Sequence, residues 1–386
     1  MAKQIKAKIT PTVLVWARNL CNLSLDEAAD RAKVSESNLG EWEKGEDLPS
    51  ITQARKLASI YKVPLISLWL NTPPTDIKIP KIRDFRRLPG AESKGLSYNL
   101  TIGIREASTK RDLAFELAEN LKRPVKAFTH HFETGVSAQS ISPEIRRILS
   151  IQRDKQKEWK DPRIAFNKIK EKVEALDILV FQYSKISVSE FRGFSIYHKK
   201  MPIIGVNRKD SPAARTFTLI HEFIHLLLGE SSVSNISEIE TGFGPHERIE
   251  KLCNEAAGSA LVPSKELRDE LGDHRDFSLT RVSALSNSFG VSRETIAMRL
   301  FQMSIIDQQG LNILLDTIRK SYKKSSKKGF VLPHQDFVSK TGKPIARLLL
   351  DNLSRGHITE NDFSDYSGLK IKHIQKVGQS VMVPGD

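Results

Sequence analysis

The feature that most constrains this chain is a five-residue segment, His221-Glu222-Phe223-Ile224-His225, inside an apolar stretch from Phe217 to Leu228. Residues four apart on an α-helix lie on one face about one turn apart, so both imidazoles can reach one metal ion. Apolar residues occur nearly all round the expected helix, which predicts that it is buried. Burying two histidines and a glutamate without partners is costly, whereas a metal ion offsets that cost. The segment therefore predicts a metal site, with Zn²⁺ as the expected ion.

Glu222 lies next to the first of these histidines and is rotated from it by one helical step. Its carboxylate can take a proton from water that the metal activates, so Glu222 is the candidate general base and acid. A structural metal site has no need of this carboxylate, and the pattern therefore favours hydrolysis. A metzincin site is excluded, because Leu228 and Ser231 stand where that class has a glycine and a histidine.

A catalytic zinc site needs a third protein ligand and an open fourth position. Glu247 and Glu250 both fall on a helix expected over about 247–261, which Pro263 ends. Spacing alone leaves these two carboxylates nearly equal as candidates. His246 is a weaker candidate because it precedes the helix.

Three short apolar segments before the metal helix predict a small β-sheet: residues 177–181, 192–197 and 202–207. Either of the last two could form a sheet edge whose backbone hydrogen bonds bind an extended substrate. An internal strand is an equally good interpretation of both segments.

The N-terminal 73 residues predict short helices with sharp breaks. Ser24 and Glu27 form a capping box at the start of one helix, and Gly45 is a glycine stop at the end of another. Asn71-Thr72-Pro73-Pro74 is a strong breaker and predicts the first domain boundary.

Residues 217–225, together with Ile249–Ala257 and Leu261-Val262-Pro263, resemble the ImmA/IrrE family of metallopeptidases. The resemblance implies that Glu250 is the third zinc ligand, which completes a gluzincin-like set with His221 and His225. It also implies a regulatory zinc endopeptidase that cleaves a specific cytoplasmic protein, such as a repressor or an antitoxin.

Leu25–Ala29, Val34-Ser35, Leu39, Trp42-Glu43 and Gly45 resemble an Xre/Cro-type helix-turn-helix. The resemblance places four residues at the groove-facing positions of the recognition helix: Glu36, Ser37, Asn38 and Glu41. Ser37 and Asn38 are the candidate DNA-binding residues among them.

The charge of this module argues against DNA, although the whole chain carries a net charge of +14. Residues 20–50 hold eight acidic and three basic side chains, and DNA phosphates repel carboxylates. Two interpretations therefore stay open: the module binds operator DNA, or it binds a protein. That protein is a second copy of the chain, a repressor or an antitoxin, so a homodimer also stays open.

The composition favours the cytoplasm. Only two cysteines occur, Cys21 and Cys253, which fits a reducing compartment. The N-terminus has no apolar run behind its positive charges, and no stretch is long and apolar enough to span a membrane.

These observations predict an α+β protein with four parts. They are an all-α helix-turn-helix domain (1–73), a helical connector (74–175), a zincin-like metallopeptidase domain with a small sheet (176–325) and a C-terminal helical module (326–386). The alternative to a peptidase is a DNA-binding transcriptional regulator or antitoxin whose metal site is not catalytic.

Overall fold

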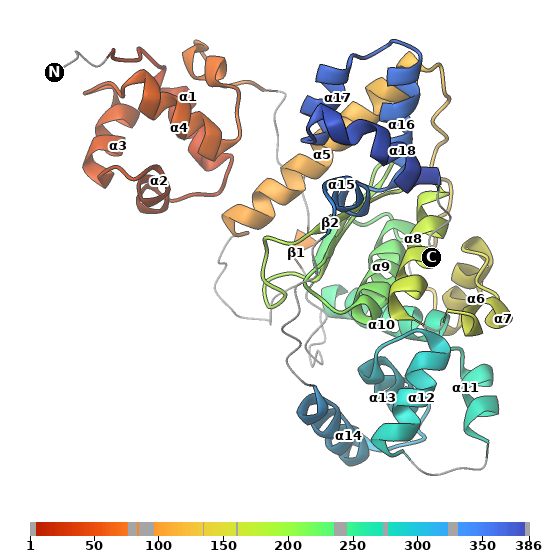
Figure 1. Cartoon of the computed structure of the whole chain (residues 1–386). Coiled ribbons are helices and arrows are strands. Elements are labelled where there is room, and N and C mark those ends of the chain that lie inside the picture. The colour runs from red at the N-terminus through yellow and green to blue at the C-terminus, as the bar shows by residue number, and fades with distance from the viewer. Residues whose placement is uncertain are drawn as a thin grey trace. The chain divides into compact units, whose positions relative to one another are not determined.

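The computed structural model describes residues 5–75, 83–84, 96–133, 135–159, 161–234, 245–272, 277–322 and 331–382. The chain divides into two compact units: Met1–Lys81 with Glu92–Ser108, and Ile82–Ala91 with Thr109–Asp386. Helices dominate and a small mixed sheet lies in the second unit (Figure 1), so the predicted α+β class is confirmed. The four-part division of the chain stays a prediction.

The first unit is a bundle of short helices. They are α1 (Pro11–Asn19), α2 (Leu25–Ala32), α3 (Glu36–Lys44), α4 (Ile51–Tyr61) and the 3₁₀ turn η1 (Leu65–Trp69). Ser24 and Glu27 form the expected capping box of α2. Gly45 ends α3 at φ +80°, a conformation that costs other residues strain. Leu39 and Trp42 of α3 are buried in the core of the bundle.

Helix α5 (Tyr98–Asn120) is 23 residues long. The division between the two units falls within it, after Ser108. In the first unit, the hydroxyl of Tyr98 donates to the Ile60 carbonyl, and Arg105 donates to the Tyr61 carbonyl. The start of α5 is therefore tied to the end of α4.

The sheet of the second unit has the order β1-β5-β3-β4-β2. Its strands are β1 (Arg83–Asp84), β2 (Leu179–Tyr183), β3 (Gly193–Ile196), β4 (Ile203–Asn207) and β5 (Ser232–Ser234). β2 runs parallel to β4, whereas β3 is antiparallel to both β4 and β5. The three expected strands are therefore present.

The expectation that β3 or β4 is a substrate-binding edge is wrong. β3 pairs with β4 on one side and β5 on the other, and β4 pairs with β3 and β2. Their backbone groups are thus satisfied within the sheet. The alternative interpretation, an internal strand, holds for both.

One core joins the sheet to the helices that cover it. Helices α8 (Pro162–Glu174) and α9 (Pro212–Leu227) pack on each other, and α9 also contacts β3 and β4. Helix α10 (Pro245–Leu261) packs on α9 from another side (Figure 1). This packing brings α10 alongside the segment that carries the two histidines.

The region 138–174 holds three helices instead of one continuous helix. It forms α6 (Ala138–Ile148), α7 (Arg153–Lys157) and α8. Pro143 lies inside α6, whose N-cap is Ser137, so this proline does not open the helix. Pro162 does stand in the first turn of α8, where its missing N–H has no helical partner to lose.

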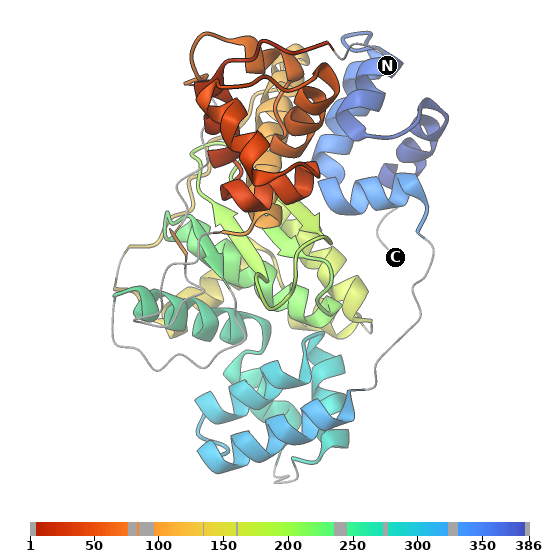
Figure 2. The same cartoon turned by 90° about the vertical axis from the view of Figure 1, so that its left-hand side faces the viewer.

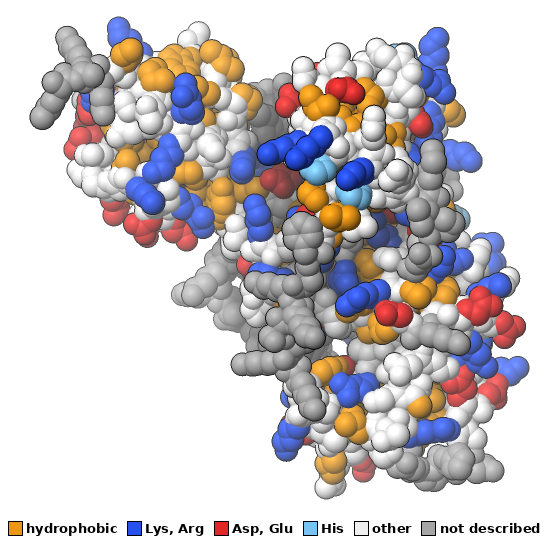
Figure 3. Space-filling view, viewed as in Figure 1, with side chains coloured by type: hydrophobic (Ala, Val, Ile, Leu, Met, Phe, Trp, Pro, Cys, Tyr) orange, Lys and Arg blue, Asp and Glu red, His pale blue; other side chains and the backbone are white. Residues whose placement is uncertain are grey.

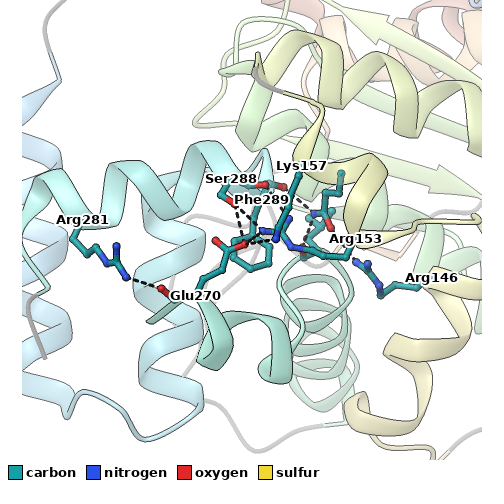
Figure 4. Close-up of polar contacts among 9 residues, drawn as sticks. Arg146, Arg153, Lys157, Glu270, Arg281, Ser288 and Phe289 are labelled. Carbon is teal, nitrogen blue, oxygen red and sulfur yellow. Dashed lines mark hydrogen bonds and ion pairs between the residues drawn. The ribbon is translucent and has the colours of Figure 1, made fainter. Parts of the chain in front are cut away.

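A polar network fixes α7 against two later helices, α11 (Ser264–Leu271) and α12 (Leu279–Phe289) (Figure 4). Arg153 forms an ion pair with Glu270, donates to the carbonyl and hydroxyl of Ser288, and stacks on the ring of Phe289. The fully buried Gln156 donates to the carbonyls of Leu261 and Phe289. These contacts join segments that lie far apart in the sequence.

Two further groups of helices complete the second unit. α11 and α12 are followed by α13 (Arg293–Gln302) and α14 (Gln308–Ser321), shown in teal to light blue in Figure 2. The C-terminal group is α15 (Pro333–Thr341), α16 (Lys343–Ser354), α17 (Glu360–Ser367), η2 (Ile371–His373) and α18 (Ile374–Met382). Gln182 of β2 donates to the Ser339 carbonyl of α15, and Asn352 of α16 donates to the Leu117 carbonyl of α5.

Across the described residues, none of the helices combines the length and apolar character that a membrane span requires.

Candidate metal centre

Helix α9 places the two histidines. The Ser211 hydroxyl accepts a hydrogen bond from the Ala214 N–H, and Pro212 stands in the first turn, so the helix has a well-defined start. Its last nine residues, from Leu219 to Leu227, are all buried. His221 and His225 are each 0% exposed, so their imidazoles need partners within the protein.

Helix α10 supplies the third group. Glu250 is 3% exposed and points its carboxylate at both histidines. Its Oε1 lies 2.8 Å from His225 Nε2, and its Oε2 lies 3.2 Å from His221 Nε2. The two Nε2 atoms are 3.1 Å apart. Three donor groups from two helices therefore face a common point.

These distances fit a divalent ion. Donor atoms at 2.0–2.1 Å from Zn²⁺ in a tetrahedral arrangement are separated by roughly 3.3 Å, close to the three separations seen here. Two imidazoles and a carboxylate are also a ligand set that zinc accepts, and they leave a fourth position for a reactant. Within the described part of the chain, no other three His, Cys, Asp or Glu side chains come together in this way.

The charges of the cluster are strongly coupled. Burial would raise the pKa of Glu250, but His221 and His225 outweigh burial and lower it to about 2. Burial would lower the pKa of His221, but the Glu250 carboxylate outweighs it, and this pKa is raised. Glu250 is therefore an anion. It can pair with a protonated His221 or bind a metal ion.

Glu222 is completely buried between α9 and the sheet. Its Oε2 accepts a hydrogen bond of 2.7 Å from the hydroxyl of Ser232 on β5. The Ser232 oxygen is also 2.7 Å from the hydroxyl of Ser195 on β3. A Cβ on Gly193 would lie 2.7 Å from Glu222 Oε1, so the strand leaves room for the carboxylate only because this residue is glycine.

Sequence patterns do not single out these three residues around Glu222. Ser232 lies in a stretch that its serines and glycines indicate as a loop, and its strand is only three residues long. Gly193 and Ser195 alternate with apolar residues in an expected strand. The alternation alone could have placed Gly193 and Ser195 on the same face of that strand.

The structure separates the two carboxylates that spacing leaves nearly equal. Glu247 is half-buried and stands outside the cluster, whereas Glu250 is inside it. The side chain of His246 lies outside the described residues. The metal-binding roles of His221, His225 and Glu250 stay predictions, and the geometry suits them.

Ser37 and Asn38, the candidate DNA-binding residues, are exposed on α3 in the first unit. The Ser37 hydroxyl donates to Glu41 of the same helix at 3.0 Å. Acidic side chains gather over α2 and α3 in Figure 3; the exposed ones include Asp26, Glu27, Asp30 and Glu36. A phosphate backbone approaching α3 meets carboxylates on this surface, and Ser37 already has a partner.

Comparisons with known proteins bear on both units. Residues 173–301 match the family model of the IrrE N-terminal-like domain, peptidase family M78. Residues 14–68 match a helix-turn-helix family model. No curated protein and no solved structure matches the chain. The chain therefore carries a metallopeptidase-type IrrE N-terminal-like domain after an N-terminal helix-turn-helix domain of the Xre type.

Proposed function

We propose that this protein is a zinc-dependent regulatory endopeptidase, gluzincin-like in its ligands, that cleaves a specific cytoplasmic protein such as a repressor or an antitoxin. One observation carries the proposal: His221, His225 and Glu250 converge within 3.2 Å of one another, and Glu222 extends from the same helix as the histidines. A metallopeptidase-type family model covers all four residues.

In this proposal His221, His225 and Glu250 hold Zn²⁺. When bound, the ion would supply Lewis-acid chemistry: it would polarise a peptide carbonyl and lower the pKa of water, so that water loses a proton and becomes a nucleophile near neutral pH. Glu222 takes the proton from the attacking water and passes it to the leaving amine, as general base and then general acid. The buried position of these groups keeps bulk water from weakening their charges.

The helix-turn-helix unit supports a regulatory role, with a protein as its partner. Its exposed acidic residues on α2 and α3 favour a partner with basic groups over DNA. We propose the repressor or antitoxin substrate, or a second copy of the chain, as that partner. The proposed cytoplasmic location rests on the low cysteine content, with Cys21 and Cys253 alone in the sequence, which fits a reducing compartment.

The experiment that tests the proposal compares cells that express the wild type with cells that express Glu222→Gln. We expect one protein to accumulate in the variant and its fragments to disappear, because the proton acceptor is gone. Purified Glu222→Gln retains zinc, because Glu222 is not a ligand. Glu247→Gln, an equivalent change on α10 outside the cluster, is the matched control and keeps cleavage. Unchanged cleavage by Glu222→Gln would falsify the mechanism.

A second candidate function is a DNA-binding regulator or antitoxin whose metal site is not catalytic. The burial of the cluster favours it: the two histidines are 0% exposed and Glu250 is 3% exposed, whereas a catalytic zinc has to keep a position that substrate can reach. This candidate requires that zinc removal unfolds the second unit, and that the protein retards promoter DNA in a salt-dependent gel shift. Retained folding after zinc removal, with loss of cleavage alone, decides for the peptidase.

A further inference from the structure

The side chain of Glu222 extends from α9, and its carboxylate is hydrogen-bonded to the sheet. Glu222, Ser232 and Ser195 are all 0% exposed, so bulk solvent does not reach their polar atoms. Ser232 follows α9 and lies in β5, while Ser195 is its register partner on the neighbouring strand β3. Two hydroxyls from two strands thus form a chain of hydrogen bonds that ends on Glu222.

The number of protons fixes the direction of this chain. An ionised carboxylate can only accept, so the Ser232 hydroxyl donates its one proton to Glu222 Oε2. The Ser232 oxygen then accepts from Ser195, which must be the donor in that pair. A hydrogen bond to a charged acceptor is stronger than one between neutral groups. The two serines therefore stabilise one orientation of the carboxylate.

Gly193 leaves the space that the Glu222 carboxylate occupies. A Cβ at this position would lie 2.7 Å from Glu222 Oε1 and 2.8 Å from its Cγ, closer than side-chain atoms approach. It would also lie 2.6 Å from Thr218 Cγ2, one turn earlier on α9. β3 and α9 therefore come close together at the point where Glu222 lies, and glycine permits that approach.

From this geometry we propose that Ser232, supported by Ser195 and by the space at Gly193, is a positioning residue for Glu222. It acts through the carboxylate and touches neither the substrate nor the ion. A general base has to stay within hydrogen-bond reach of the proton that it takes, and Ser232 limits the carboxylate to one place. This inference rests on the proposed peptidase function, because it assigns Glu222 the role of base.

The test uses zinc-loaded full-length protein and acetohydroxamate, a small chelator that needs no knowledge of the substrate. A hydroxamic acid binds a metal ion as its anion, so its proton has to pass to a nearby base. We expect Ser232→Ala to bind acetohydroxamate about tenfold more weakly. Loss of a residue that hydrogen-bonds to a site residue commonly has an effect of this size. Zinc affinity and the cobalt(II) absorption spectrum stay unchanged, because the three ligands are not altered.

Matched variants separate positioning from general damage to the fold. Ser231→Ala is the control, because the Ser231 hydroxyl accepts from the Tyr197 N–H, whereas Ser232 is the residue that donates to Glu222. Ser232→Thr keeps the hydroxyl and restores binding. Gly193→Ala weakens binding by displacing the carboxylate, although both serines are present. In the Glu222→Gln background, Ser232→Ala has no further effect, because the base on which it acts is gone.

A crystal structure of zinc-loaded Ser232→Ala gives the second readout. We expect the Glu222 carboxylate to leave its wild-type position while His221, His225 and Glu250 stay in place. Wild-type acetohydroxamate affinity in Ser232→Ala, with an unmoved carboxylate, overturns the inference. If the zinc-loaded wild type does not bind acetohydroxamate, the open metal position of the proposed function is wrong. The position of the carboxylate in the crystal then decides the role of Ser232 by itself.

Discussion

Two clusters of largely buried charged side chains, one in each unit, differ in whether their own hydrogen-bond donors and acceptors match. In the first unit, Arg18 donates from Nε and Nη2 to the two oxygens of Glu43 at 2.8 and 2.9 Å, and from Nη1 to the Leu23 carbonyl. Donors and acceptors match, and the charges cancel. This pair needs no ligand.

The cluster of His221, His225 and Glu250 has no such match. Each Nε2 faces both the carboxylate and the other Nε2. If both nitrogens donate to Glu250, both carry a hydrogen although the two nitrogens are only 3.1 Å apart. One cation at the common point satisfies all three groups. Burial of charged side chains alone therefore does not indicate a metal site. A buried set of donors and acceptors that do not match does indicate one.

The largest predicted effect is the loss of zinc affinity when one ligand of the cluster is removed. Glu250→Ala removes the carboxylate and leaves two imidazoles, so zinc affinity falls by at least about 100-fold, more than for a residue that only supports a ligand. Isothermal titration with zinc measures it. Glu247→Ala, one turn earlier and outside the cluster, binds zinc like the wild type. Equal zinc affinity in both variants would mean that Glu250 is not a ligand.

The Arg18–Glu43 pair leads to a prediction about the stability of the first unit. Arg18→Ala leaves the Glu43 carboxylate, 9% exposed, without its partner, and the first unit loses about 1–3 kcal/mol of unfolding free energy. Denaturant titration measures this loss. Lys6→Ala removes an ion pair whose side chains are about half exposed and costs at most about 1 kcal/mol. A rise in stability of the first unit on adding zinc would contradict the claim that its pair is self-sufficient.

A smaller effect concerns pH. The pKa of His221 is raised in the metal-free protein, so at a pH below that value the proton and zinc compete for one site. Zinc affinity therefore rises with pH, by about tenfold per unit until His221 loses its proton. Competition with a coloured chelator at several pH values measures the slope. A pH-independent affinity would exclude proton release from the cluster.

The smallest effect is expected on the exposed face of α3. Asn38→Ala changes an exposed side chain, so the unfolding free energy moves by less than about 0.5 kcal/mol. Gel shifts with promoter DNA at two salt concentrations test the other half of the question. We expect no specific DNA complex that depends on Asn38, because carboxylates dominate this surface. A specific complex that Asn38→Ala abolishes would restore DNA as the partner.

Local patterns predict the parts of the molecule that short-range physics decides. The capping box at Ser24 and Glu27, the glycine stop at Gly45 and the apolar helix around His221 all form as expected. Each depends on residues within about one turn of one another. For the same reason, the spacing of the two histidines is enough to predict that they share one helix face.

Long-range contacts decide the rest. The choice between Glu247 and Glu250 depends on how α10 packs on α9, which helical spacing does not determine. Ser232 belongs to a three-residue strand that forms because β1 and β3, both distant from it in sequence, pair with it. No local pattern contains that information.

The third donor, Glu250, lies on a different helix from the two histidines. An ion bound by all three ties α9 to α10, and it binds the folded second unit in preference to its unfolded chain. Its concentration is therefore linked to folding, so metal supply sets the melting temperature of this unit and leaves that of the helix-turn-helix unit untouched. Metal starvation would then lower the thermal stability of the proposed protease domain without unfolding it at ordinary temperature, and it would leave the helix-turn-helix unit as stable as before.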